Sequence, residues 1–397
     1  MTATTGPART ILALDGGGVR GIFSIAILER IEALHARAAG APVRLADRMD
    51  LVGGTSTGAI IATGVALGLS AARLRQMYLE LAPRVFRRPK LRLALVHALF
   101  DASALRREIE AVVGNRRLDT PDLATGLAII TKRLDTGGAW IVSNNPRARY
   151  WEDHPGGRYI GNRQYRIADL IRASAAAPYF FEPQEIPIVR GKPPGLFVDG
   201  GITPHNNPAL ALLQLATIPA YGYAWPAGVD RLRILSVGTG TYRDRMSLDT
   251  ARRAPAAQLG IAALASMVSD SSSQVLTMLH MLGRTHTPWS LNSEIGDMGG
   301  FTLAPEPLFT FERYDARLER DWLKRELGIV VGPAEVAALT RLDNIDAIPL
   351  AYEIGTAVAE RMVKPEHLGL PADMPSQRSG GTPVDGAAEC GSESKDP

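Results

Sequence analysis

Two strand–turn–helix units near the start of the sequence constrain the fold more than any other feature. Residues 11–14 form a short apolar run that enters a glycine cluster at 15–18, and the apolar spacing of residues 22–28 is typical of a buried helix. The pattern returns where the run 51–53 leads through a second glycine-containing turn into the apolar residues 59–67. Strands that alternate with helices predict a mostly parallel sheet with helices on both faces.

The same alternation continues along the chain. Further apolar strand candidates lie at 127–130, 140–142, 196–198 and 234–237. Helical patterns lie around 167–175, 208–215 and 261–282. We therefore expect an α/β fold of three layers, α/β/α, with a mostly parallel central sheet.

The ordered part of the chain is expected to form one domain over residues 8–370. The motifs described below lie within about 9–240, and residues from about 241 to 370 form a C-terminal extension. From residue 371 the sequence is rich in Pro, Ser, Gly and acidic residues with few apolar ones. That composition predicts a disordered tail over 371–397.

Composition narrows the class of protein. Hydrophobic residues make up 46% and charged residues 21% of the 397 residues, as in an ordinary globular protein. A net charge of +3 is too small to indicate nucleic-acid binding. The lone Cys390 excludes an intramolecular disulfide and a cysteine-based metal site. Without an apolar N-terminal segment or a run of about 18 apolar residues, we expect a cytoplasmic protein whose membrane contact, if any, is peripheral.

The turn of the second unit places a serine between a strand and a helix, in the run Gly54-Thr55-Ser56-Thr57-Gly58. The two glycines remove Cβ atoms that would clash in a sharp turn. The hydroxyl then stands at the helix N-terminus, where unpaired N–H groups favour developing negative charge. Ser56 is therefore a candidate nucleophile, and the alternative is a polar turn that only links strand to helix.

The turn of the first unit, residues 15–21, reads Asp-Gly-Gly-Gly-Val-Arg-Gly. Successive glycines let backbone N–H groups converge on an anion, which fits an oxyanion hole or a phosphate cradle. The turn lacks the Lys-Ser/Thr of a P-loop and the G-x-G-x-x-G spacing of a dinucleotide-binding fold. A candidate nucleophile one strand later favours the oxyanion hole, and a flexible glycine turn is the remaining alternative.

A third candidate is Asp199, which ends the apolar run 196–198 and precedes Gly200-Gly201. A carboxylate in that position lies at the edge where parallel-sheet proteins bind their ligands. Aspartate is also common at strand ends as a cap or turn residue. The case for a functional role rests on the other two motifs.

Together the three motifs resemble the patatin-like phospholipase family, in which DGGGVRG, GTSTG and DGG occur in this order. The resemblance includes the segment 173–178 before the aspartate and Asn206-Asn207-Pro208 after it, and it covers roughly residues 9–240. It implies that Ser56 is the nucleophile and Asp199 its base, so that a Ser-Asp dyad replaces a Ser-His-Asp triad. It also implies an oxyanion hole formed by Gly16, Gly17, Gly18 and Arg20, and an elbow shaped by Gly54 and Gly58.

The implied activity is that of a lipid acyl hydrolase of the phospholipase A type, which cleaves acyl esters of phospholipids through an acyl-enzyme. No metal and no cofactor are expected. The stretch between DGG and Asn206 is longer here than is usual in the family, which makes His205 an auxiliary candidate for proton transfer. A histidine in a surface loop is the other interpretation.

Several alternatives stay open at this point. The dyad would also serve an esterase or thioesterase acting on soluble acyl compounds, a ligand-activated effector phospholipase, or a binding protein that retains the pocket. The basic run 84–92 leads into residues 93–100, and Leu91, Leu95 and Leu99 recur every four residues, which fits peripheral contact with an anionic membrane. It equally fits a core-facing helix with a solvated basic approach. The extension after about residue 241 has no assigned role, and control of the activity, homo-oligomer contacts and packing are the alternatives for it.

Overall fold

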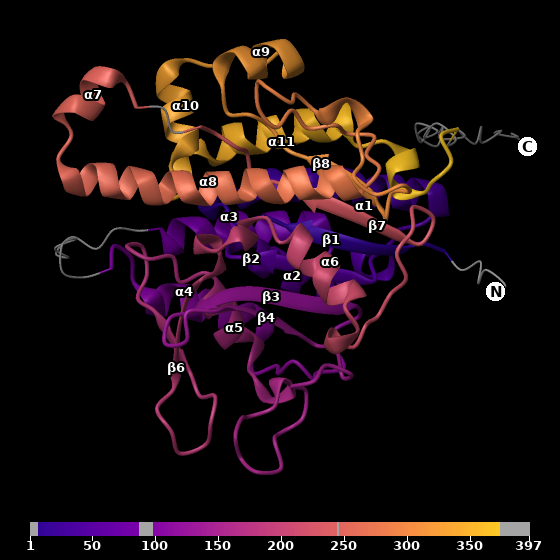
Figure 1. Ribbon diagram of the computed structural model, residues 1–397, viewed down its shortest axis with the longest axis vertical. Coiled ribbons are helices and arrows are strands. Elements are labelled where there is room, and N and C mark those ends of the chain that lie inside the picture. Colours follow the sequence, from indigo (N-terminus) through magenta and orange to yellow (C-terminus); the bar gives the residue numbers. More distant parts are fainter. Residues whose placement is uncertain (1–6, 87–97, 244–245, 374–397) are drawn as a thin grey trace, which may run out of the picture.

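The central sheet sets the frame for everything else in the protein (Figure 1). In the computed structural model, which describes residues 7–86, 98–243 and 246–373, the sheet has eight strands. They are β1 (Arg9–Leu14), β2 (Leu51–Thr55), β3 (Gly126–Arg133), β4 (Ala139–Ser143), β5 (Gln184–Ile186), β6 (Gly195–Asp199), β7 (Leu232–Val237) and β8 (Thr310–Tyr314). Their order is β5-β6-β3-β2-β1-β7-β8, and β4 also pairs with β3.

The sheet is mostly parallel, as the sequence predicts. The strand pairs β1–β2, β1–β7, β2–β3 and β7–β8 are parallel. Both β4 and β6 run antiparallel to β3, and β5 runs antiparallel to β6. The parallel strands are almost continuously buried, because helices cover both faces.

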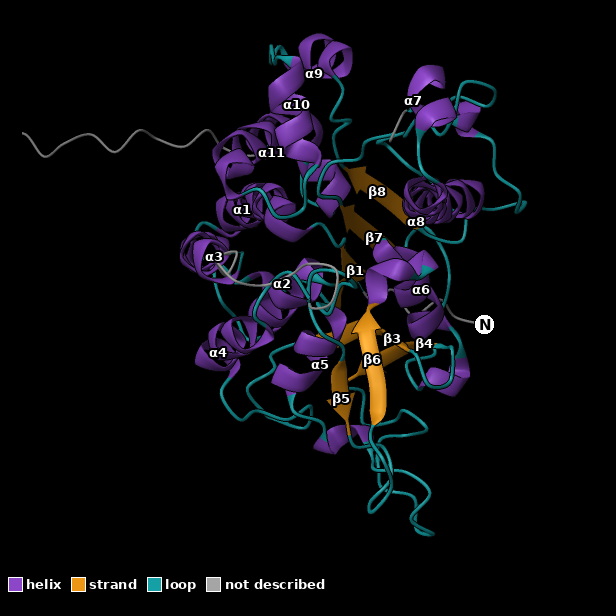
Figure 2. Cartoon of the chain, turned by 90° about the vertical axis from the view of Figure 1, so that its left-hand side faces the viewer, coloured by secondary structure: helices purple, strands orange, loops and turns teal. Residues whose placement is uncertain are grey.

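The described helices form the two outer layers. They are α1 (Gly21–Ala39), α2 (Thr57–Ala66), α3 (Ala71–Val85), α4 (Ala102–Val113), α5 (Ile167–Ser174), α6 (Ala209–Thr217), α7 (Leu248–Arg253), α8 (Ala256–Leu282), α9 (Arg320–Leu327), α10 (Pro333–Thr340) and α11 (Ile348–Met362). Figure 2 shows α1 to α5 and α9 to α11 on one side of the sheet, and α6 and α8 on the other. The three-layer α/β/α prediction is therefore confirmed.

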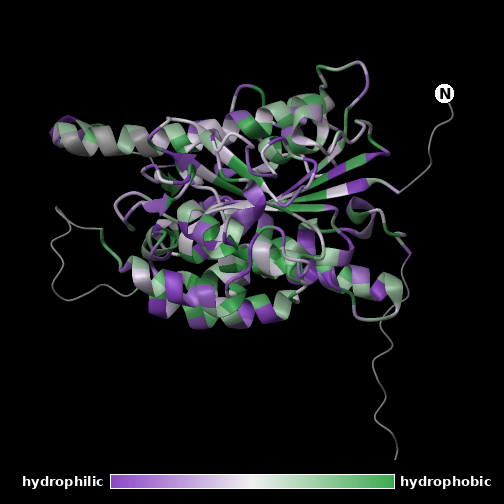
Figure 3. Ribbon diagram, turned by 90° about the horizontal axis from the view of Figure 1, so that it is seen from below, coloured by the Kyte–Doolittle hydropathy of each residue, from purple (hydrophilic) through white to green (hydrophobic). Residues whose placement is uncertain are grey.

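Local sequence signals account for several helix boundaries. The side chains of Ser70 and Asp101 accept hydrogen bonds from the first turns of α3 and α4. Gly40 ends α1 in the left-handed conformation that favours glycine. In Figure 3 the helices carry both apolar and polar residues along their length, as expected for helices that cover a sheet on one face.

The C-terminal extension packs into the main core. Strand β8 lengthens the sheet beyond β7, and α11 lies against α1. The contact between these helices is close, because a Cβ at Gly355 would lie 2.6 Å from the carbonyl oxygen of Phe23. One buried apolar cluster accordingly includes Leu12 near the N-terminus and Leu368 near the end of the extension.

Strands β2 and β6 lie end to end along the same side of β3. Strand β2 pairs with positions 126–130 of β3, and β6 pairs with positions 131–133. Since β4 occupies the opposite side of β3 over 128–132, β6 must continue the line of β2. The two strands run in opposite directions, so their carboxyl ends meet. Thr55 pairs with Ile130 and Asp199 with the next residue, Thr131.

No described helix combines the length and the apolar character needed to cross a bilayer. Most of the basic run proposed for contact with an anionic membrane, residues 87–92, lies outside the described residues, as does 374–397 of the expected tail.

Candidate functional site

Ser56 stands in a strained turn between β2 and α2. Its φ of 55° and ψ of −123° lie where residues with a side chain are rarely found. The flanking glycines are required by space: a Cβ at Gly54 would lie 2.1 Å from the backbone of Gly58, and one at Gly58 would lie 2.1 Å from the carbonyl oxygen of Leu14. The turn is thus the sharp elbow that the pentapeptide predicts, with α2 packed directly on the sheet.

The side chain of Asp199 accepts a hydrogen bond from Ser56. The hydroxyl Oγ lies 2.6 Å from Oδ2, and the other carboxylate oxygen accepts from the N–H of Gly201 at 2.7 Å. The meeting of β2 and β6 along β3 brings the two residues together. The general rule for parallel sheets does not explain this placement, because β6 is antiparallel to its neighbour.

Burial changes the protonation of Asp199. The residue is 4% exposed, and this burial raises the pKa of its carboxyl group to about 6, against the opposing hydrogen bonds from Ser56 and Gly201. A carboxyl group with a pKa near neutrality is a better proton acceptor than an ordinary aspartate, and is ionised at physiological pH. The pair can therefore take up and return a proton.

Ser174, which the sequence motifs do not single out, holds the elbow in place. It is the last residue of α5 and is fully buried. Its hydroxyl accepts a hydrogen bond from the N–H of Ser56 at 2.8 Å and donates one to the carbonyl oxygen of Ile130 at 2.6 Å. This bridge ties the strained residue to β3. The segment 173–178 was noted for its resemblance alone, and nothing in its alanine-rich sequence indicates such a role.

The glycine loop 16–18 lies beside the elbow, but its three amides differ. A Cβ at Gly16 would lie 3.2 Å from the Cβ of Ser56, so the loop and the hydroxyl are neighbours. The N–H of Gly16 donates to the carbonyl oxygen of Asn206 at 3.1 Å and is not free to bind an oxyanion. Within the described residues, the N–H groups of Gly17 and Gly18 have no acceptor. The prediction of Gly16, Gly17 and Gly18 as oxyanion donors stays a prediction, and of the three amides that of Gly16 has a backbone partner.

Arg20 anchors the glycine loop to the C-terminal extension. Its guanidinium donates to the carbonyl oxygens of Leu339 and Thr340, at 3.3 and 3.2 Å, and lies over the ring of Tyr242. The adjacent Val19 N–H donates to the carbonyl oxygen of Leu342 at 2.9 Å. The expected role of Arg20 in positioning the loop fits these contacts. They place the charge at the end of α10.

A second anchor is a buried cluster that the sequence motifs miss. Arg313 on β8 binds both carboxylate oxygens of Asp15, at 3.1 and 2.7 Å, and also Asp315 at 2.6 Å. Burial raises the pKa of Asp15 to about 6 despite this pairing. Burial also disfavours the charge on Arg313, but its two carboxylate partners prevail and hold its pKa above the ordinary range. The first residue of the glycine motif is thereby fixed by the extension.

His205 does not reach the pair through its ring. Its backbone carbonyl accepts a hydrogen bond from the hydroxyl of Thr55 at 2.6 Å. The ring nitrogen Nδ1 is buried without a partner among the described residues, and burial lowers the pKa of the imidazole. The ring therefore makes no contact here that supports the auxiliary role in proton transfer.

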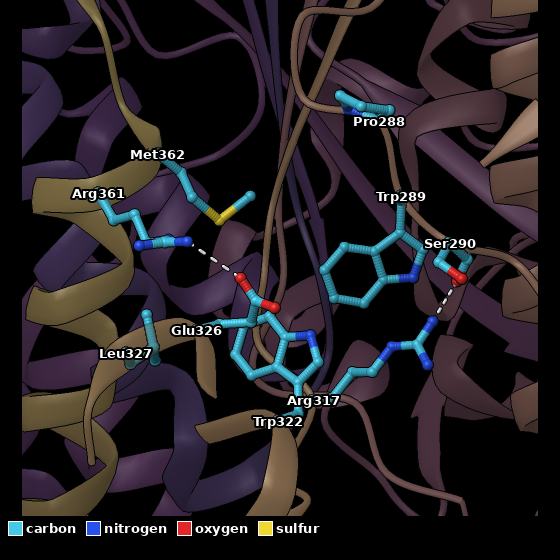
Figure 4. Close-up of a pocket in the computed structure, with 9 residues that line it drawn as sticks. All are labelled: Pro288, Trp289, Ser290, Arg317, Trp322, Glu326, Leu327, Arg361 and Met362. Atoms are coloured by element: carbon cyan, nitrogen blue, oxygen red, sulfur yellow. Dashed lines mark hydrogen bonds and ion pairs between the residues drawn. The ribbon is translucent and has the colours of Figure 1, made fainter. Parts of the chain in front are cut away.

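A hollow of about 250 Å³ lies in the C-terminal extension, apart from Ser56, Asp199 and the glycine loop. It is lined by Pro288, Trp289, Ser290, Arg317, Trp322, Glu326, Leu327, Arg361 and Met362, and Figure 4 shows both indole rings at its wall. Across the described residues, no group of three or more His, Cys, Asp or Glu side chains is placed to hold a metal ion.

Comparison with known proteins gives a consistent picture. Residues 12–213, about half of the chain, match the family model described as patatin-like phospholipase. A cGAMP-activated phospholipase of Escherichia coli (strain TW11681) is 30% identical over 54% of this chain and 58% of its own length. A cUMP-AMP-activated phospholipase of Escherichia coli is 33% identical over 58% of this chain and 65% of its own.

These relatives are matched over less than two thirds of their own length. Among solved structures, human GIVD cytosolic phospholipase A2 aligns over 91% of this chain and 59% of its own, with a TM-score of 0.43 and 12% identity.

Proposed function

The chain belongs to the patatin-like phospholipase family, and on that premise we propose that it cleaves acyl esters of phospholipids with Ser56 as nucleophile and Asp199 as base. The observation that carries the proposal is the 2.6 Å hydrogen bond from the Ser56 hydroxyl to a buried carboxyl group whose pKa is raised to about 6. A serine hydroxyl needs a base in reach as it attacks, and this carboxylate is in reach.

The reaction proceeds in two halves. As the Ser56 Oγ attacks the ester carbonyl carbon, its proton passes to Asp199, and the carbonyl oxygen becomes an oxyanion. Collapse of the tetrahedral intermediate breaks the ester bond, and the departing alcohol, a lysophospholipid, takes the proton from Asp199. Water then attacks the acyl-enzyme with Asp199 again as base, which releases the fatty acid and restores the hydroxyl.

The oxyanion is held by the amides of Gly17 and Gly18 in this proposal. Their N–H groups lack an acceptor, whereas that of Gly16 is engaged by Asn206. Removing one such donor costs roughly 3–4 kcal/mol of transition-state stabilisation in other acyl transfer enzymes. The loop lies between the anchors at Arg20 and Arg313, so its donors are held in place before the substrate arrives.

The test is fatty-acid release from mixed phospholipid vesicles by the wild type, Ser56→Ala and Asp199→Asn. We expect release by the wild type alone, with all three proteins folded. A His205→Ala variant serves as the neighbouring control and should retain most of the release. Fatty-acid release by Ser56→Ala would rule out Ser56 as the nucleophile. Hydrolysis of a short-chain p-nitrophenyl ester without any release from vesicles would instead support the soluble acyl ester as substrate.

A second proposal concerns control of the reaction. Two relatives of 30% and 33% identity carry names that describe them as activated by cGAMP and by cUMP-AMP. This favours a ligand-activated phospholipase, in which a cyclic nucleotide raises a low basal rate. Adding cGAMP or cUMP-AMP to the vesicle assay should increase fatty-acid release severalfold. An unchanged rate with both nucleotides would contradict activation by this class of ligand.

A further inference from the structure

The hollow in the C-terminal extension is built from segments that the family match does not cover. Its walls come from α9, the end of α11, and the residues around 288–290 and 317, all beyond residue 213. Its volume of about 250 Å³ is enough for a single ring system with a substituent, but too small for a phospholipid. It is therefore a separate feature that the hydrolytic site does not explain.

Two indole rings form the apolar wall of the hollow. Trp289 is 8% exposed and Trp322 is partly exposed, and their ring centres lie 6.5 Å apart with a tilt of 48°. This arrangement leaves no room for a third ring between them. Because Arg317 lies over the ring of the buried Trp289, a planar ligand would instead stack on the exposed part of Trp322, beside Trp289 (Figure 4). Stacking on aromatic side chains is the usual way in which proteins hold nucleobases.

The charges at the hollow are mainly positive. Glu326 is shared by Arg361 at 3.0 Å and Arg325 at 2.8 Å, so its charge is more than balanced. Arg317 lies over the ring of Trp289 and donates to the carbonyl oxygen of Ser290, but pairs with no carboxylate within the described residues. Burial and the nearby charge of Arg243 lower its pKa, against the opposing charge of Glu319. A guanidinium without a bound carboxylate can take a phosphate, which its planar fork fits.

We propose that this hollow binds a nucleotide, with the base against Trp322 and Trp289 and the phosphate at Arg317. The proposal rests on the ligand-activated function given above and names a place in this chain where the ligand acts. The carboxylate of Glu326 faces the same hollow and supplies an acceptor for an amino or imino group of the base.

The hollow is joined to the glycine loop by two routes. Arg317 follows Arg313 and Asp315 on one segment, and Arg313 binds both Asp15 and Asp315. On the other route, α9 packs on α11, which contacts the start of α1 and the loop beside it. A nucleotide that draws α9 towards the 288–290 segment therefore acts on elements that support the proposed oxyanion donors.

Titration calorimetry on the full chain tests the site without reference to turnover. The probes are AMP, GMP and cGAMP, with adenosine and ribose phosphate as single-moiety controls. We expect one site that binds at least one nucleotide about tenfold more tightly than either control, because base and phosphate both contribute. Trp322→Leu and Arg317→Met should each weaken that binding about tenfold or more, and the exposed Arg190→Met should leave it unchanged.

The Ser56→Ala variant separates this inference from the proposed chemistry. It should bind the nucleotide as the wild type does, even though it lacks the proposed nucleophile. The absence of binding by all three nucleotides, or binding that Trp322→Leu and Arg317→Met leave unaffected in folded protein, would overturn the inference while leaving the hydrolase proposal intact. If a nucleotide binds without any change in the rate of ester hydrolysis, the inferred effect of the bound nucleotide on the glycine loop would be overturned.

Discussion

Ser56 and Asp199 meet directly, so the proton that leaves the hydroxyl in the proposed reaction makes one short transfer. No imidazole lies between them, and the carboxyl group acquires a suitable pKa from burial. Both residues are predictable from sequence, because each ends a clear strand in a glycine-containing motif. Ser174 is not predictable, because its bond to Ser56 joins positions 118 residues apart and its own segment carries no signal.

The pH dependence of hydrolysis should report the ionisation of Asp199. Since the base must be ionised, kcat/KM for a soluble ester should rise about tenfold per pH unit below about pH 6 and level off above it. Asp15 also has a pKa raised to about 6, so the profile should be repeated with Asp15→Asn. A flat profile in the wild type, or a midpoint that disappears in Asp15→Asn, would argue against Asp199 as the base.

Replacing Asp199 by asparagine should stabilise the fold at neutral pH. Its pKa rises from 3.8 to about 6 on folding, so its contribution to stability is fully present below 3.8 and is lost as the pH rises towards 6. At about 1.4 kcal/mol per unit, the buried charge costs roughly 3 kcal/mol at neutral pH. Thermal melting should show a higher Tm for Asp199→Asn at neutral pH and no difference near about pH 4.

The control for this comparison is Asp346→Asn, an exposed aspartate for which the same substitution should leave the Tm nearly unchanged. A lower Tm for Asp199→Asn at neutral pH would mean that the carboxylate is stabilised in the fold, contrary to the effect of its burial.

At the scale of elements, β8 and β6 explain most of what sequence patterns do not predict. The apolar runs identify β1, β2, β3, β4, β6 and β7, but β8 contains Glu312 and Arg313, each 1% exposed. A strand that contains charged residues does not match the apolar pattern of a buried strand. Its charges can be buried because oppositely charged partners, distant in sequence, pair with them. The direction of β6 cannot be predicted either, because an apolar run looks the same in a parallel and in an antiparallel strand.

Removal of Arg313 should destabilise the protein strongly. In Arg313→Leu the carboxylates of Asp15 and Asp315 remain buried without their partner, which costs about 3–5 kcal/mol. Denaturant unfolding should show this loss. The matched control is Arg163→Leu, whose arginine pairs at the surface with Asp119 and Glu152 and should cost about 1 kcal/mol or less. Equal losses in the two variants would show that the cluster contributes little.

Over the whole molecule, the extension after residue 240 is part of the same body as the motif-bearing region. It supplies the last strand of the sheet, the helix that packs on α1, and both anchors of the glycine loop. The sequence predicts one domain over 8–370 but gives no role to the extension, because it matches no motif. Its role follows from contacts such as Arg313 with Asp15, which are 298 positions apart.

We expect residues 8–370 to unfold as one cooperative unit. Since one apolar cluster extends from Leu12 to Leu368, neither region has a core of its own. Calorimetry should give a single transition whose calorimetric and van't Hoff enthalpies agree. Two separated transitions, one sensitive to Arg313→Leu and the other not, would contradict a single unit.

The backbone of Ser56 also bears on the history of chains with this fold. At a φ of 55° a serine is held at a cost of roughly 1–3 kcal/mol, which glycine would avoid. While the hydroxyl is needed, selection retains it. In a lineage that no longer depends on the reaction, mutation to glycine would relieve the backbone, whereas alanine would keep the cost. Descendants that have become pure binding proteins should therefore carry glycine at this position more often than chance allows.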